Sequence, residues 1–260
     1  MTAAQDILAL LSGGVVGFTL GLIGGGGSIL AVPLLLYVVG MDDPHRAIGT
    51  TAVAVAFNAA TGAVSHARRG NVRWPTAAVF SAAGILGAAI GSTLGKQFDG
   101  QRLLTLFALL MIVIAALMLR RRGGEDAADA KLTWRRTGKL AAVGLGVGML
   151  AGFFGIGGGF LIVPGLVLAT GMPMIAAVGT SLISVFSFGL TTAANYALSG
   201  LVVWPVAGLF ILGGLGGGVA GSRLAHHLSS RRNALNRVFA AVIVVVALYM
   251  LSHSLGMIGR

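Results

Sequence analysis

Two glycine-rich runs, roughly 130 residues apart, interrupt apolar stretches that would otherwise each form one long membrane-spanning helix. The first run reads GGGGSILAVP over residues 24–33, and the second reads GIGGGFLIVP over residues 155–164. A broken helix exposes backbone N–H and C=O groups that lipid does not satisfy, so such breaks occur where protein or a water-filled cavity surrounds them. A matched pair of breaks in the two halves of a membrane protein indicates a transport site.

The composition is typical of a protein embedded in a lipid bilayer. Apolar residues make up 56% of the sequence and charged residues only 10%, whereas soluble domains carry roughly 25% charged residues. We therefore expect an all-α polytopic membrane protein. The net charge of +11 comes from Lys and Arg clustered in the predicted loops. This pattern favours basic cytoplasmic loops and argues against a nucleic-acid partner.

The apolar stretches lack the residue types that most enzymes and metal sites use. The chain has no cysteine, which excludes disulfides and thiolate metal sites. The seven acidic residues all lie at a terminus or in a predicted loop, and no His/carboxylate cluster in the sequence suggests a metal site. We therefore expect no catalytic residue, no metal, no cofactor and no carboxylate-based proton relay across the membrane.

Apolar runs predict five segments in each half, when they are compared with a bilayer of about 30 Å that takes about 20 helical residues. The first two segments of each half are short and predict a hairpin of half-helices that meets at the glycine run, with either shallow or nearly complete penetration. The polar linker 120–138 separates a first repeat, 1–119, from a second repeat, 139–260. The predicted segments are 7–23, 28–40, 47–66, 75–95 and 102–119, then 139–154, 159–171, 176–199, 204–224 and 237–257.

The two halves share further motifs at nearly the same offset as the glycine runs. The matched motifs are Gly49-Thr50-Thr51 with Gly179-Thr180-Ser181, and Gly70 before Trp74-Pro75 with Gly200 before Trp204-Pro205. So many matches at one offset indicate a duplicated unit. The two Trp-Pro pairs are expected to anchor helix ends at the membrane interfaces.

The positions of Lys and Arg in short loops predict the orientation of the chain. Arg68, Arg69 and Arg73 place one loop of the first half in the cytoplasm, whereas the equivalent loop Ser199-Gly200-Leu201 is uncharged and is expected outside. The basic linker 120–138 is expected in the cytoplasm. These assignments agree only if the two repeats are inverted relative to each other and both termini face outward, a common design among secondary transporters.

The glycine runs predict an anion site at the membrane centre. A half-helix that starts there directs unpaired N–H groups and the positive end of its dipole inward, and adjacent glycines let the backbone form a nest of N–H donors. The alternative is that the glycines only permit tight helix packing, which we favour for glycines spaced every four residues, such as Gly13, Gly17 and Gly21. The candidate anion-binding residues at the breaks are Gly26, Gly27, Ser28, Gly157, Gly158 and Gly159.

Hydroxyl and amide side chains in the third segments are further candidates. Thr50, Thr51, Thr180 and Ser181 stand where these segments open, and their hydroxyls either cap a helix N-terminus or donate to substrate oxygens. Side chains deeper in the segments are second-tier candidates, whose alternative role is hydrogen bonding between helices. They are Asn58, Thr61, Ser184, Thr191 and Asn195.

The glycine-rich breaks ending in Pro33 and Pro164, the two GT-[T/S] motifs, the basic linker and the duplicated length of 260 residues resemble the TauE/SafE family over essentially the whole chain. This resemblance implies an exporter of sulfite, an organosulfonate or another small anion in the bacterial inner membrane, without enzymatic activity. The second break reads GIGGG where the first reads GGGG, so the resemblance does not imply two identical sides of the site.

Three other functions are alternatives. A passive anion channel would share the nest of N–H donors but would need a continuous pore. A membrane-embedded enzyme, such as a lipid-diphosphate phosphatase, would need acid/base or metal-binding carboxylates near its site, and the predicted spans have none. A structural assembly subunit would account for the hydrophobicity but not for two facing anion nests.

Overall fold

A computed structural model describes residues 3–23, 25–120, 134–155, 159–227, 232–254 and 256. Its regular elements in these ranges are all helical, as predicted. The longer helices are α1 (Ala3–Ile23), α3 (Pro44–Arg68), α4 (Trp74–Gln97), α5 (Gly100–Arg120), α6 (Trp134–Phe154), α8 (Met174–Leu198), α9 (Trp204–His227) and α10 (Arg232–Ser254). Among the described residues, α1, α3, α4, α6, α8 and α9 are long and apolar enough to cross a membrane.

Each half begins with a hairpin whose second arm is short. In the first half this arm consists of a 3-10 helix, η1 (Gly25–Leu30), one α-helical turn, α2 (Ala31–Pro33), and a π-helical turn, η2 (Leu34–Val38). In the second half the arm is a single helix, α7 (Gly159–Thr170). The short arm of the first half is irregular because glycines carry a high entropy cost in a helix and Pro33 has no N–H to donate. Its helical backbone begins at Gly25, three residues before the predicted start.

The first arm of each hairpin is longer than its apolar run indicated. Helices α1 and α6 have 21 residues each, a length of about 31 Å at 1.5 Å per residue. Their additional residues are at the N-terminal end and are largely polar, among them Gln5, Asp6 and Thr137. Hydropathy does not detect a helical turn that projects beyond the apolar core, so each hairpin combines one arm of full membrane length with one short arm.

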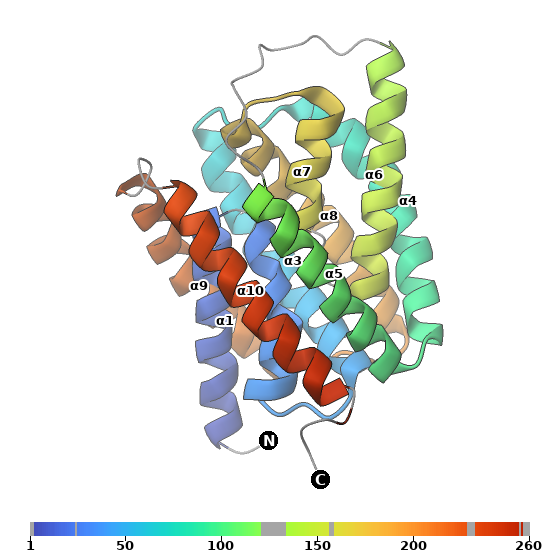
Figure 1. The fold of residues 1–260 in the computed structure, drawn as a ribbon, viewed down its shortest axis with the longest axis vertical. Helices are drawn as coiled ribbons and strands as arrows, with labels where there is room; N and C mark the ends of the chain where they lie inside the picture. Colours follow the sequence, from blue (N-terminus) through green and yellow to red (C-terminus); the bar gives the residue numbers. More distant parts are fainter. Residues whose placement is uncertain are drawn as a thin grey trace.

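Two close helix pairs join the halves. Helix α1 packs on α9, and α6 packs on α4 (Figure 1). A Cβ at Gly17 would overlap the carbonyl oxygen of Gly214, and a Cβ at Gly148 would overlap that of Gly84. The neighbouring glycines at four-residue spacing make the same kind of contact, which confirms their predicted packing role and lets the backbones approach closely. They are Gly13, Gly21, Gly144 and Gly152.

Helices α3 and α8 occupy the centre of the molecule and are the most deeply buried of the long helices. They contact each other, and each also contacts one helix of the other half, α9 or α4. Helix α3 begins at Pro44, after Asp43, whose side chain accepts from the backbone N–H groups of His45 at 2.8 Å and Arg46 at 3.4 Å. An acidic N-cap followed by proline is a favoured start of a helix.

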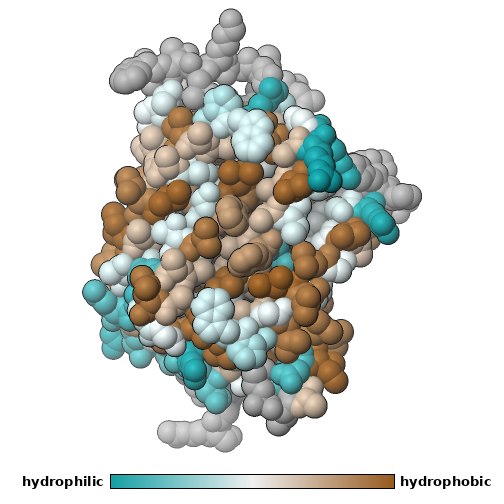
Figure 2. All heavy atoms as spheres, turned by 180° about the vertical axis from the view of Figure 1, so that it is seen from behind, coloured by the Kyte–Doolittle hydropathy of each residue, from teal (hydrophilic) through white to brown (hydrophobic). Residues whose placement is uncertain are grey.

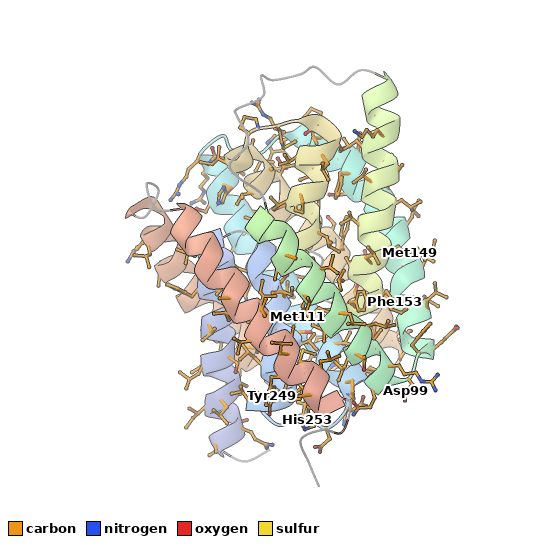
Figure 3. The ribbon with its side chains drawn as sticks, in the orientation of Figure 1. Asp99, Met111, Met149, Phe153, Tyr249 and His253 are labelled. Atoms are coloured by element: carbon orange, nitrogen blue, oxygen red, sulfur yellow. The ribbon has the colours of Figure 1, made fainter. Side chains whose placement is uncertain are left out.

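The last helices of the two halves, α5 and α10, pack on each other across one face (Figure 1). Met111 of α5 is fully buried there, and Tyr249 and His253 lie toward the lower end of α10 (Figure 3). The ring of Tyr37, in η2, lies 5.1 Å from that of Tyr249 and 5.3 Å from that of His253, measured between centroids. These aromatic contacts connect the short arm of the first hairpin to α10.

Corresponding helices of the two halves run in opposite directions. In Figure 1, α1 begins at the lower end and α6 at the upper end, while α5 runs upward and α10 downward. The central helices α3 and α8 end in the same way. Gly70 and Gly200 follow them with φ of +71° and +69°, and their N–H groups donate to the carbonyl oxygens of Ala67 and Ala197. Such positive φ values are accessible to glycine without strain.

The face of the molecule shown in Figure 2 is largely apolar. Brown and pale side chains dominate the face in Figure 2, and polar side chains gather toward its ends and edges. Trp74 and Trp204, which begin α4 and α9, are both exposed, as expected of residues that anchor helix ends at the membrane interface.

Candidate functional site

The short arms that follow the two glycine breaks come together inside the protein. The 3-10 helix η1 packs against α7 and also contacts α8. Gly27, Ser28 and Gly159 are buried and Gly26 is partly buried. Gly157 and Gly158 lie outside the described residues. The first N–H groups of η1 and α7 have no partner within their own helix, and the structure brings these two segments into contact.

Gly27 has a packing role of its own. A Cβ at this position would overlap the backbone of Thr19 and Leu20 in α1. The hydroxyl of Thr19 lies 3.4 Å from the carbonyl oxygen of Gly27 and also donates to carbonyls of its own helix. Close packing of the break on α1 therefore requires glycine here, whether or not an anion binds beside it.

The two GT-[T/S] motifs hold the halves together. Thr50 Oγ1 accepts from the N–H of Val203, at the start of α9, and Thr180 Oγ1 accepts from the N–H of Arg73, at the start of α4, both at 3.0 Å. The preceding glycines let the connecting loops approach, since a Cβ at Gly49 would overlap the carbonyl oxygen of Leu201. Gly179 makes the equivalent contact with Asn71. These threonines thus bind the N-terminal ends of helices in the opposite half.

Most of the other predicted hydroxyls bond within the protein. Thr51, Ser181, Thr61 and Thr191 donate to carbonyl oxygens three or four residues earlier in their own helices. Ser184 of α8 lies 2.9 Å from Ser81 of α4, oxygen to oxygen, in a buried contact between helices. Helix-to-helix and intrahelical bonding thus accounts for these side chains.

Lys96 lies just beyond the predicted segment 75–95 and is partly buried in the structure. It lies in the last turn of α4, and its Nζ donates to Asn195 Oδ1 at 2.7 Å and to Ser199 Oγ at 2.8 Å in α8. The amide of Asn195 donates in turn to Ser92 at 2.7 Å and Thr93 at 2.9 Å. Ser92 and Lys96 are four residues apart, as are Asn195 and Ser199, so each pair lies on one helix face. This spacing is visible in the sequence and is the signal that could have predicted the network.

Several buried side-chain atoms of the described residues have no hydrogen-bond partner. Asn58 stands out among them because both Nδ2 and Oδ1 are unpaired and the residue is only 6% exposed. Buried polar groups are normally paired, so this second-tier candidate has unused binding capacity. Others are Thr192 Oγ1, Tyr196 Oη and His45 Nδ1.

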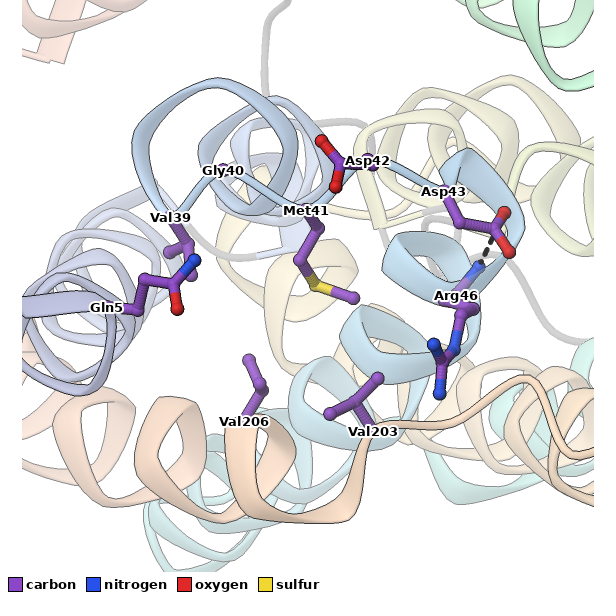
Figure 4. Close-up of a pocket in the computed structure, with 9 residues that line it drawn as sticks. All are labelled: Gln5, Val39, Gly40, Met41, Asp42, Asp43, Arg46, Val203 and Val206. Atoms are coloured by element: carbon purple, nitrogen blue, oxygen red, sulfur yellow. Dashed lines mark hydrogen bonds between the residues drawn. The ribbon is translucent and has the colours of Figure 1, made fainter. Parts of the chain in front are cut away.

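A pocket of about 250 Å³ opens at the end of the molecule where α1 and α9 begin (Figure 4). It combines one guanidinium, from Arg46, with the carboxylates of Asp42 and Asp43. No local sequence pattern predicts this pocket, because its walls come from the first hairpin, α3 and the start of α9. The lining residues are Gln5, Val39, Gly40, Met41, Asp42, Asp43, Arg46, Val203 and Val206.

Positive charge is confined to helix ends and loops. Within the helices no Lys or Arg lies farther from an end than the sixth residue, the position of Lys139 in α6 and of Arg237 in α10. A ligand at the middle of the membrane would therefore meet backbone dipoles and neutral side chains.

The chain is similar to known membrane transporters along nearly its whole length. A sequence model of the family described as "Sulfite exporter TauE/SafE" matches residues 9–250. A "Probable membrane transporter protein" of Xylella fastidiosa is 52% identical over 255 residues, covering 98% of each chain. "Probable membrane transporter protein YunE" of Bacillus subtilis is 26% identical, covering 86% of this chain and 90% of the relative. No solved structure matches this chain. These family and relative names describe transporters and not enzymes.

Proposed function

Because this chain belongs to the TauE/SafE family of membrane transporters, we propose that it is a secondary transporter that exports a small anion across the bacterial inner membrane. Sulfite or an organosulfonate is the proposed substrate. The contact between η1 and α7, the short arms that follow the two glycine breaks, supports this proposal. Helix starts present unpaired N–H groups and the positive ends of helix dipoles, which stabilise an anion without a basic side chain.

The proposal includes two inverted repeats with both termini outside. Its support is the basic loop with Arg68, Arg69 and Arg73, the uncharged loop at Gly200, and the opposite directions of corresponding helices in Figure 1. In this orientation the first hairpin enters from outside and the second from the cytoplasm. The pocket at Arg46 then opens to the outside, and alternating access would come from movement of one repeat against the other.

The membrane potential favours export of an anion over import. A negative-inside potential favours the exit of each negative charge by about 2.3 kcal/mol per 100 mV. No Asp or Glu lies in the middle of a described helix, so the proposed cycle uses no carboxylate proton relay. The gradient of the anion and the potential supply the driving force.

Flux into proteoliposomes tests the function. We expect purified protein to move sulfite, thiosulfate, small sulfonates or small carboxylates, with saturation and with counterflow of labelled substrate against an unlabelled load. Counterflow is the property of a carrier, and flux without saturation or counterflow would instead indicate a passive channel. Failure to move any of these anions would contradict the proposed function.

Substitution at the breaks tests the site. Gly26→Leu combined with Gly159→Leu should abolish flux, because a leucine blocks approach to the N–H groups. Gly216→Leu is the matched control, since nothing lies within 4 Å of a Cβ at this exposed position of α9. Gly27 is unsuitable for this test because any side chain there disturbs the contact with α1. Full flux in the folded double variant would exclude a site at the breaks.

A further inference from the structure

The side chain of Asn58 is a buried amide in the middle of α3 with no hydrogen-bond partner. Only 6% of the residue is exposed, and neither Nδ2 nor Oδ1 is paired within the described part of the chain. Exchanging the two atoms by rotating the amide changes nothing, because both are unpaired. No bulk water compensates at this depth of a membrane, so the amide destabilises the fold unless something binds it.

Packing does not require an amide at this position. Asn58 lies against Gly214 of α9, where an added Cβ would overlap Nδ2. The corresponding residue of the second repeat is Phe188 of α8, whose ring lies against Gly84 of α4 in the same manner. Phe188 is fully buried and stacks on Phe80 with 6.0 Å between ring centroids. An apolar ring thus makes the contact that the amide makes in the first repeat.

Asn58 is connected to the first glycine break through two helices. Gly214 is also the residue where α9 meets α1, because a Cβ at Gly17 would overlap its carbonyl oxygen. Two residues farther along α1, Thr19 and Leu20 contact Gly27 of the break. The unpaired amide is therefore linked to the proposed anion site through packed contacts of α9 and α1.

We propose that Asn58 contacts the transported anion and selects one that carries a hydrogen-bond donor next to a single negative charge. This inference rests on the proposed transport function. Nδ2–H donates to an anionic oxygen, and Oδ1 accepts an O–H or N–H of the same ligand. A ligand with acceptors only would leave Oδ1 unpaired and facing a negative charge, which is unfavourable in a buried site.

The distribution of charge explains the limit of one negative charge. No Lys or Arg lies beyond the sixth residue from a helix end, so the middle of the described bundle supplies backbone dipoles and neutral side chains. An isolated charge in a region of low dielectric constant is costly, and a second charge on the same ligand raises this cost further. A monoanion that uses both atoms of the Asn58 amide satisfies these conditions.

Competition between two matched sulfonates tests the selection. The probes are 2-hydroxyethanesulfonate and ethanesulfonate, which carry the same charge and differ in one hydroxyl. We expect the hydroxylated probe to inhibit flux of whichever anion the wild-type protein transports at a concentration at least about tenfold lower. Asn58→Leu should remove this preference and should not lower the thermal unfolding midpoint, because it replaces an unpaired amide with an apolar side chain of similar size.

The outcomes separate this inference from the proposed function. If the wild-type protein moves no anion, the proposed function fails. If it moves an anion but the two probes compete equally, or neither competes, the inference is overturned. It is also overturned if Asn58→Leu folds and keeps the preference. If the leucine variant does not fold, the competition is repeated with Asn58→Ala. Phe188→Leu is the control variant, and it should leave the preference unchanged.

Discussion

Removal of the Thr50 hydroxyl should destabilise the protein and leave substrate affinity unchanged. Thr50 Oγ1 accepts from the N–H of Val203 at 3.0 Å, across the boundary between the two halves. The substitution Thr50→Val keeps the shape of the side chain and deletes the acceptor. The N–H of Val203, immediately before α9, then has no partner from α3.

The expected cost follows from the position of this bond. Loss of a capping hydrogen bond costs typically about 1 kcal/mol, and leaving a buried donor unsatisfied costs about 1–3 kcal/mol. Val203 is partly buried, so we expect the free energy of unfolding to fall by roughly 1–2 kcal/mol. At about 2–4 °C per kcal/mol for a domain of this size, the thermal midpoint should fall by roughly 2–8 °C. Thr180→Val should cost less, because Arg73 is exposed and water replaces the lost acceptor.

Thermal unfolding of the detergent-solubilised protein is the assay, with Thr51→Val as the matched control. Thr51 is also fully buried, but its hydroxyl donates to Ile48 in its own helix, so its removal leaves no backbone N–H unpaired. We expect its midpoint to stay closer to that of the wild type. A Thr50→Val variant no less stable than Thr51→Val, but with a raised KM for the anion, would refute the capping role and favour substrate donation.

Two further results are expected. Cysteines introduced at Arg68 and at Leu198, equivalent exposed helix ends in this cysteine-free chain, should react with an impermeant reagent from opposite sides of the membrane, and labelling from the same side would contradict inversion. Lys96→Met should lower the free energy of unfolding by about 1–3 kcal/mol through loss of the bonds to Asn195 and Ser199. Arg102→Gln, at an exposed charge, should stay within about 0.5 kcal/mol, and equal midpoints for these two variants would exclude a stabilising role for Lys96.

The membrane-spanning segments were predictable because lipid imposes a length and an apolar composition on each helix. The ten predicted segments correspond to the helical arms and helices of the structure, with differences at their ends. The starts of α1 and α6 were missed because polar turns project beyond the apolar core. Lys96 lay just beyond the predicted segment 75–95 for the same reason, since a charge ended the apolar run while the helix continued to Gln97.

The roles of individual polar residues were not predictable from one sequence. The repeated Gly-Thr motif was compatible with capping or with substrate binding, and its partners are Val203 and Arg73, more than 100 residues away along the chain. Likewise, Gly27 packs on α1, a contact that the run of four glycines does not specify. Asn58 was one of several candidates, and only the absence of a partner for its amide separates it from the others.

The sequence by itself determined the membrane environment, the helical segments and the interruption of two of them by glycines, because these depend on local composition and periodicity. The tertiary structure decided that η1 and α7 pack together, which threonine caps which helix, and that Asn58 and Phe188 make similar contacts with different chemistry. The physical reason is that a hydroxyl or amide has the same local sequence pattern whether it is paired or unpaired. Its role depends on atoms that the fold brings to it from distant parts of the chain.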